Sequence, residues 1–161
     1  MVLSKHYLSK DKVTSIRDGI TQLDKAYWQD RSTHKPNLGI DGSIGRYFSC
    51  GRISCPELIR QQIDAIAPEY APYGLEDWVI NWMPENGFIP PHIDNEGYLA
   101  FSVLSLQSDS GQFVYYQNNQ LTQPVTIPDQ AGQLVSINDI TTIHSVPTAL
   151  TDRYTLIFLY Q

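Results

Sequence analysis

The spacing of apolar residues changes near residue 75 and divides the chain into two parts. In residues 10–28 apolar side chains recur every three or four positions, which predicts an amphipathic helix with one buried face. These side chains are Val13, Ile16, Ile20, Leu23 and Tyr27. Residues 54–68 predict a second helix, with Ser54 as its cap and Pro68 as its stop. Its apolar stripe consists of Leu58, Ile59, Ile63 and Ile66.

The second part consists of short runs rich in β-branched and aromatic residues, which are typical of strands. Gly, Pro, Asn and Asp separate runs such as "EDWVINWM", "YLAFSVLSLQ", "GQFVYYQ", "QPVTIP", "GQLVSIN" and "RYTLIFLYQ". With "PPHID" and "HSVPT" as further short strands, about eight strands favour a jelly roll. We therefore predict a mainly β (α+β) fold in one domain, residues 1–161. Residues 1–75 would give helical support to a jelly-roll core at 76–161, with both helices packed on one sheet.

Composition limits the class of protein. A chain of 161 residues with 42% apolar and 17% charged residues is typical of one globular core. Its formal charge of −6 makes nucleic acid an unlikely partner. There is no apolar run long enough for a signal peptide or a membrane span, so we expect a soluble, cytoplasmic protein. Cys50 and Cys55 match no trusted zinc or redox spacing, and we expect reduced thiols there.

One candidate for chemistry is the segment "PHIDNEGY" at 91–98. His92 and Asp94 are two residues apart, so on a strand both side chains point to the same face. His144 lies 52 residues further on, where a rolled sheet can bring it alongside them. Two histidines and one carboxylate on one side of an ion form the arrangement found in non-haem Fe(II) oxygenases. His92, Asp94 and His144 are therefore candidate metal ligands.

A histidine and an aspartate at this spacing also occur by chance as a solvated pair, so the hypothesis depends on other residues. Arg153 opens the apolar strand "RYTLIFLYQ", where a guanidinium favours a carboxylate or phosphate partner. Thr155 faces the same way and adds a hydroxyl. The alternative for Arg153 is a rim residue that reaches solvent.

These motifs resemble those of the Fe(II)- and 2-oxoglutarate-dependent oxygenases, which have a double-stranded β-helix (cupin-like jelly-roll) fold. The resemblance covers roughly residues 78–160 and rests on "HID", "GQF", "PDQAGQLVSIN", "IHSV" and then "RYT", nine residues after the distal histidine. The prolyl-4-hydroxylase-like members show a similar order. The resemblance implies that His92, Asp94 and His144 bind Fe(II), and that O2 takes an open position on it. It also implies that Arg153 and Thr155 hold the distal carboxylate of 2-oxoglutarate.

The stretch "NWMPENGFIPPH" is similar to the AlkB-type branch, in which an asparagine precedes the first metal histidine by eleven residues. The similarity places Asn81 and Met83 beside the cosubstrate. Met83 stands where that branch usually has tyrosine, and Leu159 stands where it has a second arginine. Animal prolyl hydroxylases have a tyrosine where this chain has Ser105 or a neighbour.

We expect a catalytic set of His92, Asp94, His144 and Arg153 that hydroxylates a protein, peptide or small-molecule substrate and releases succinate and CO2. Candidate substrate contacts are Tyr98, Trp82, Tyr115, Arg46 and Tyr47. Candidate apolar walls are Phe101, Val103, Phe113 and Ile157. Two alternatives stay open. One is an AlkB-like oxidative demethylase of nucleic acid, and the other is a non-catalytic jelly-roll module for sugar or ion recognition.

Overall fold

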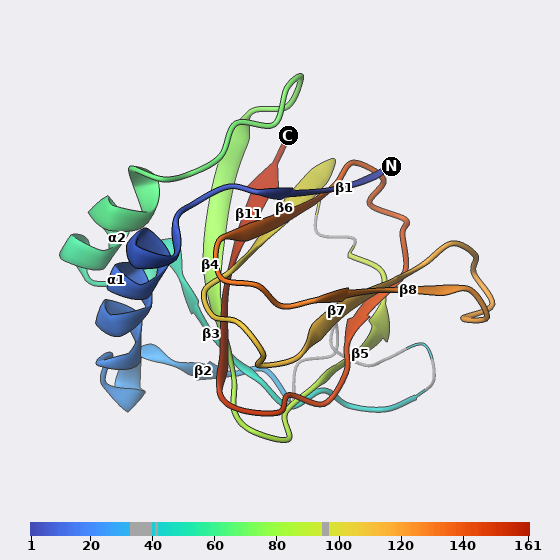
Figure 1. Ribbon diagram of the computed structural model, residues 1–161, viewed down its shortest axis with the longest axis horizontal. Helices are drawn as coiled ribbons and strands as arrows, with labels where there is room; N and C mark the ends of the chain where they lie inside the picture. Colours follow the sequence, from blue (N-terminus) through green and yellow to red (C-terminus); the bar gives the residue numbers. More distant parts are fainter. Residues whose placement is uncertain (33–39, 41, 95–96) are drawn as a thin grey trace.

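The computed structural model describes residues 1–32, 40, 42–94 and 97–161. Two antiparallel sheets form the molecule (Figure 1). The larger sheet contains, in order of pairing, β1 (Val2–His6), β9 (Gln133–Ile137), β6 (Ala100–Ser105), β11 (Arg153–Tyr160), β4 (Leu75–Met83), β3 (Phe48–Gly51) and β2 (Gln29–Asp30). The smaller sheet contains β5 (Ile89–His92), β10 (His144–Val146), β7 (Gln112–Tyr116) and β8 (Pro124–Pro128). This arrangement confirms the predicted jelly roll.

Both α-helices lie on the outer face of the larger sheet, as predicted (Figure 1). Helix α1 (Lys10–Thr21) begins at Ser9, whose side chain accepts a hydrogen bond from the backbone N–H of Lys12 at 3.3 Å. It ends before the predicted residue 28, because Asp24 caps a separate 3-10 turn, η1 (Lys25–Tyr27). The helix face toward the sheet consists of Val13, Ile16 and Ile20.

Helix α2 (Glu57–Asp64) differs from the prediction at its start. Ser54 belongs to a preceding 3-10 turn, η3 (Arg52–Ser54), and Pro56 is the N-cap of the helix without a side-chain hydrogen bond. Ile59 and Ile63 are buried, whereas Leu58 is 69% exposed and does not belong to the apolar face. The predicted stripe was therefore one residue too wide.

Strand alternation separates two apolar cores. On β11, Leu156, Phe158 and Tyr160 face the helices and belong to one core. Residues 155, 157 and 159 of the same strand line a cavity between the sheets. The predicted helical support, residues 1–75, also contributes the strands β1, β2 and β3 to the larger sheet. In the described part of the chain, no helix is long and apolar enough to cross a bilayer.

Candidate metal centre and adjoining cavity

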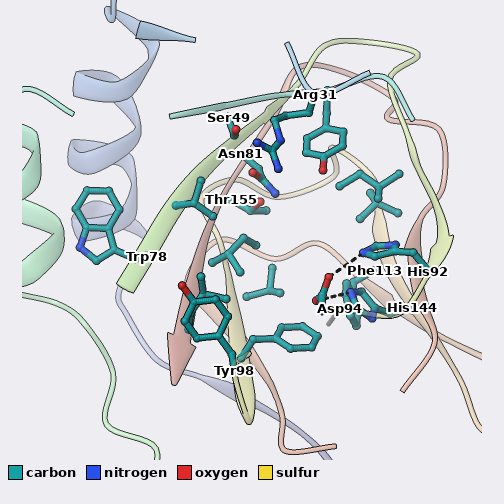
Figure 2. Close-up of a pocket in the computed structure, with 18 of the residues that line it drawn as sticks. Arg31, Ser49, Trp78, Asn81, His92, Asp94, Tyr98, Phe113, His144 and Thr155 are labelled. Carbon is teal, nitrogen blue, oxygen red and sulfur yellow. Dashed lines mark ion pairs between the residues drawn. The ribbon is translucent and has the colours of Figure 1, made fainter. Parts of the chain in front are cut away.

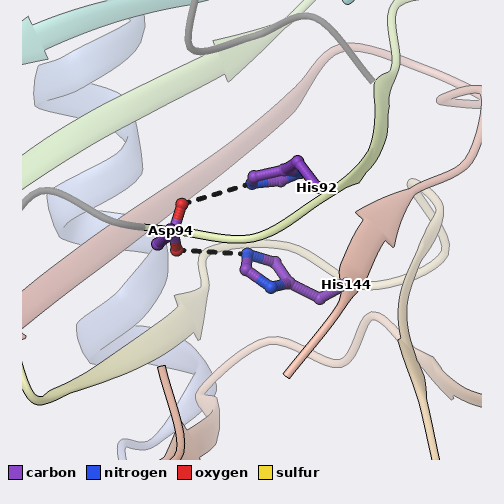
Figure 3. Close-up of side chains that lie close together, drawn as sticks. All are labelled: His92, Asp94 and His144. Atoms are coloured by element: carbon purple, nitrogen blue, oxygen red, sulfur yellow. Dashed lines mark ion pairs between the residues drawn. The ribbon is translucent and has the colours of Figure 1, made fainter. Parts of the chain in front are cut away.

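Three predicted ligands meet on the smaller sheet. His92 ends β5 and His144 begins β10, and the two residues are partners across this antiparallel strand pair. Asp94 follows β5 and directs its carboxylate at both imidazoles (Figure 3). Its Oδ1 lies 3.3 Å from Nε2 of His92, and its Oδ2 lies 3.2 Å from Nε2 of His144. The ligand atoms of the three residues all lie within 4.8 Å of one another.

The other nitrogen of each ring defines the tautomer. Nδ1 of His92 lies 2.8 Å from the carbonyl oxygen of Pro90, and Nδ1 of His144 lies 3.0 Å from that of Thr142. Because a carbonyl only accepts, each Nδ1 carries the hydrogen and donates it. A neutral imidazole then presents a lone pair at Nε2, and both lone pairs face the Asp94 carboxylate. Such a cluster of acceptors is stable only with a proton or a cation among them.

The pKa shifts of His92 and Asp94 in the metal-free protein also indicate a site that attracts a cation. Burial lowers the pKa of His92, but the hydrogen bond and the negative charge of Asp94 outweigh this, so the pKa is raised above its ordinary value. Burial raises the pKa of Asp94, but the charges and hydrogen bonds of His144 and His92 outweigh it and hold the pKa well below its usual range. The site therefore keeps its carboxylate ionised and attracts positive charge.

A divalent ion fits these distances. Bonds of about 2.1 Å place neighbouring ligand atoms about 3 Å apart around an octahedral ion. The two separations of 3.2 and 3.3 Å are close to that value. The donated Nδ1 hydrogens are the usual supporting contacts of metal-bound histidine. Two histidines and one carboxylate on one side leave the remaining positions open, which is the ligand set of non-haem Fe(II) oxygenases.

The metal candidates border a cavity of about 320 Å³ between the two sheets (Figure 2). Its apolar wall includes all four predicted residues, namely Phe101, Val103, Phe113 and Ile157. Phe101 and Phe113 also pack against the His144 ring, with ring centroids 4.9 and 5.7 Å away. The apolar side of the cavity therefore covers one of the candidate metal ligands.

A row of polar residues crosses this otherwise apolar face of the larger sheet. The strand register aligns five of them from β2 through β3, β4 and β11 to β6. We call this set the polar row: Gln29, Ser49, Asn81, Thr155 and Ser105. Among the described residues, the side chains of Ser49, Asn81 and Thr155 have no hydrogen-bond partner. Since Ser49 and Thr155 are 7% and 2% exposed, the row offers buried polar groups to a ligand in the cavity.

Arg153 lies beside the polar row and is 3% exposed. Its Nε and Nη2 donate to the Asp129 carboxylate at 2.6 and 2.9 Å. Ser110 also donates to this carboxylate, at 2.9 Å. Arg153 lines the cavity as expected, but Asp129 already balances its charge. The sequence did not indicate Asp129. In the structure it stands out because its side chain is buried, although it directly follows the largely exposed strand β8.

Of the other predicted site residues, some line the cavity and others do not. Asn81, Thr155, Tyr98 and Tyr47 line the cavity. Trp82 follows Asn81 on β4 and therefore points to the opposite face, where it stacks on other aromatic rings.

Three further predicted residues are not among those that line the cavity. Met83 is 1% exposed and packs in the core between the sheets. Tyr115 is half-buried on β7, and Arg46 is exposed.

Arg31 is a cavity residue that the sequence analysis missed. It directly follows β2, and its backbone N–H donates to the carbonyl of Tyr47 at 3.0 Å, which continues the pairing with β3. Because Gln29 and Arg31 are two residues apart on an extended segment, both face the cavity. Figure 2 shows the Arg31 guanidinium directed toward Asn81 and Thr155. The alternation of Gln29 and Arg31 was the feature of the sequence that could have identified this residue. It was not recognised because β2 has only two residues.

Comparisons with known proteins identify the fold. No protein-family model and no curated protein matches the sequence. The structure is similar to that of a prolyl-4-hydroxylase from Pseudomonas putida, with 16% identity, a TM-score of 0.67, and 99% of this chain and 91% of that chain covered. It is also similar to an oxidoreductase of the 2OG-Fe(II) oxygenase family from Burkholderia pseudomallei (17%, TM-score 0.67, coverage 99% and 84%).

A third similar structure is HygX from Streptomyces hygroscopicus, which was solved with nickel and 2-oxoglutarate bound. Its identity to this chain is 14% and the TM-score is 0.67, with 99% of this chain and 82% of HygX covered. At such identities the similarity establishes a shared fold. The chain therefore has the fold of the 2OG-Fe(II) oxygenases, with a His-Asp-His cluster beside its cavity.

Proposed function

We propose that this protein is an Fe(II)- and 2-oxoglutarate-dependent oxygenase. The observation that carries the proposal is the convergence of two imidazole lone pairs and one carboxylate at distances that fit a divalent ion. His92, Asp94 and His144 would hold Fe(II). The structure of HygX with nickel and 2-oxoglutarate supports this choice of metal site and cosubstrate for the shared fold.

The cavity suits a small dicarboxylic acid. Its volume of about 320 Å³ lies at the lower end of the range for small-molecule sites. Arg153 and Thr155 would bind the distal carboxylate, and Asn81 offers an amide beside them. When bound, Fe(II) and 2-oxoglutarate supply the oxidation: O2 and 2-oxoglutarate give succinate and CO2, and one oxygen atom enters a substrate C–H bond.

The residues of this chain position the reactants and exclude water. Backbone carbonyls of Pro90 and Thr142 orient the two imidazoles, so that each Nε2 points at the metal position. Phe101 and Phe113 shield the His144 side from solvent. Excluding water strengthens each charged contact and protects the oxidant from side reactions.

For the substrate, we propose a peptide, with prolyl hydroxylation as the reaction, or a small molecule. The similarity to the Pseudomonas putida prolyl-4-hydroxylase supports this class. The formal charge of −6 argues against binding to a phosphate backbone. Tyr98 and Tyr47 line the cavity and are the candidate substrate contacts that the structure supports best.

The proposal is tested by adding Fe(II) and 2-oxoglutarate to the protein without oxygen. We expect the weak visible charge-transfer band of the chelate, and we expect His92→Ala and His144→Ala to abolish it. His6→Ala is the matched control, because His6 is exposed on β1, and it should keep the band. A wild-type protein that stays colourless would contradict the proposal.

The substrate class is tested separately. Succinate release should increase with a peptide, amino-acid or other small-molecule pool and not with alkylated oligonucleotides. The opposite result would favour the oxidative demethylase over the hydroxylase.

A further inference from the structure

The end of the cavity that lies away from the polar row carries a further inference, which rests on the proposed function. Along the cavity face of β11, Arg153 and Thr155 are 3% and 2% exposed, whereas Ile157 and Leu159 are half-buried. The cavity therefore opens to solvent where β11 reaches Leu159. The residues around Leu159 are the ones that a substrate meets as it enters from this end.

Three strands of the larger sheet connect this open end to the metal candidates. Asp77, Leu159 and Phe101 are partners in register on β4, β11 and β6. All three residues line the cavity, and the centroid of the Phe101 ring lies 4.9 Å from that of the His144 ring. Two strand spacings amount to about 10 Å. Asp77 therefore lies about 10 Å across the sheet from the residue that packs on a candidate metal ligand.

Asp77 brings a negative charge to the open end. Apart from the metal candidates, the charged residues among the described lining of the cavity are Arg31, Arg153 and Asp77. Oδ1 of Asp77 accepts a hydrogen bond from the backbone N–H of Trp78 at 2.7 Å. Within the described part of the chain, no lysine, arginine or histidine forms an ion pair with Asp77. Its carboxylate is therefore available to a cation in the cavity.

Arg52 in η3 acts on Asp77 from nearby, but its charge is already balanced. Its Nε and Nη2 donate to the Asp64 carboxylate at 3.0 and 2.9 Å. These contacts with Asp64 raise the pKa of Arg52 above its ordinary value, and the negative charge of Asp77 adds to the increase. Two carboxylates and one guanidinium leave one net negative charge on this group. Together with the formal charge of −6 of the chain, it attracts cations to the open end.

The open end also has room and a suitable wall for a cationic group. Gly51 pairs with Val79 of β4 and lines the cavity, and a Cβ atom added at Gly51 would meet no atom within 4 Å. Figure 2 shows Tyr98 at the opposite end of the cavity from Arg31 and Ser49. An aromatic ring and a carboxylate at one end of a cavity are groups that bind ammonium and guanidinium ions.

We infer that the substrate carries an ammonium or guanidinium group, and that Asp77 binds this group and selects for it. The cation lies about 10 Å from the C–H bond that reacts beside the metal, which is the span of two strand spacings. In an extended peptide, this span corresponds to a lysine or arginine two or three residues from the reacting residue. In a free amine, it corresponds to an aliphatic chain of similar length.

The test measures succinate release in air from the Fe(II)-loaded protein with 2-oxoglutarate and one of four substrate pools. Three pools contain short proline peptides that differ in one residue, two or three positions from the proline, which is lysine, glutamine or glutamate. The fourth pool contains free aliphatic diamines. We expect the lysine peptides or the diamines to give the highest rate at low concentration, which reports kcat/KM. The pool that responds distinguishes a peptide substrate from a free amine.

The substitution Asp77→Asn removes the selecting charge. It should lower the rate with the responding cationic pool by about 5- to 20-fold, between the effects of an exposed and of a buried charge pair. The rate with the glutamine peptides should fall by less than about twofold, because they carry no charge at that position. Asp77→Glu keeps the charge and should recover part of the preference for the cationic pool.

Glu76→Gln is the matched control. Glu76 is the neighbouring acid on β4, its side chain is exposed, and strand alternation directs it to the opposite face, so no rate should change. If Asp77→Asn leaves the rate with the cationic pool unchanged, or lowers the cationic and glutamine rates equally, the inference is wrong. It is also wrong if 2-oxoglutarate gives the charge-transfer band but neither cationic pool exceeds the glutamine and glutamate peptides. If the band itself does not form, the proposed function fails.

Discussion

The buried pair of Asp129 and Arg153 allows a quantitative test by the substitution Asp129→Asn. The Asp129 side chain is 1% exposed and accepts two hydrogen bonds from Arg153 and one each from Ser110 and Ser105. Asparagine keeps one oxygen acceptor but leaves the Arg153 charge buried without a counter-charge. Breaking such a pair costs about 3–5 kcal/mol in the free energy of unfolding. For a chain of this size, that corresponds to a fall in Tm of about 6–20 °C.

Chemical denaturation followed by circular dichroism measures this loss. A double-mutant cycle with Arg153→Met separates the pair from the individual residues, and we expect a coupling energy above about 1 kcal/mol. Asp18→Asn is the control, because Asp18 is exposed on α1 and its replacement should change stability by less than about 0.5 kcal/mol. A loss below about 1 kcal/mol for Asp129→Asn would refute the view that Asp129 neutralises Arg153 in a buried site.

Two further predictions concern the fold. The Asp64 carboxylate accepts hydrogen bonds from Arg52 and from the indole of Trp78, and the Arg52 contact outweighs burial and lowers the pKa of Asp64. A carboxylate whose pKa is lower in the folded protein than in the unfolded chain stabilises the fold at pH values above its unfolded-state pKa. This stabilisation is lost as the pH falls through the folded-state pKa. Asp64→Asn should therefore cost on the order of 1 kcal/mol at pH 7 and progressively less below about pH 4, as thermal unfolding across pH would show; a cost independent of pH would contradict this. Gly132→Ala should destabilise by at least about 2 kcal/mol in urea denaturation, because Gly132 has φ +87° and an added Cβ would overlap the Leu8 carbonyl; near-normal stability would show that the turn adapts.

The elements that the sequence predicted well are those with strong local periodicity. The strand alternation of β11 and the apolar face of α1 depend on residues close in the chain, and both appear as expected. Helix ends were less predictable. The hydroxyl of Ser54 could have capped the helix, but the N-cap is Pro56, two residues later, whose backbone φ angle is fixed by its ring.

The candidate site was predictable where its residues share a short motif. His92 and Asp94 are two residues apart, and the distal His144 needed only the assumption of a rolled sheet. Arg31 and Asp129 were not predictable, because each acts through residues far away in the chain. Asp129 follows β8 and accepts from Arg153, and the Arg31 guanidinium is directed toward Asn81 on β4 and Thr155 on β11 (Figure 2). Trp82 was assigned to the site although strand alternation already placed it on the face opposite Asn81.

The most direct test of the central claim is the release of succinate from 2-oxoglutarate in air. Purified protein supplied with Fe(II) should convert 2-oxoglutarate to succinate, slowly without a substrate and faster with the correct one. Chelation should stop the release because it removes Fe(II), and His144→Ala should stop it because it removes one of the three candidate ligands. Succinate release that persists without Fe(II), or that is as fast in His144→Ala as in the wild type, would contradict the assignment of His92, Asp94 and His144 as the metal centre.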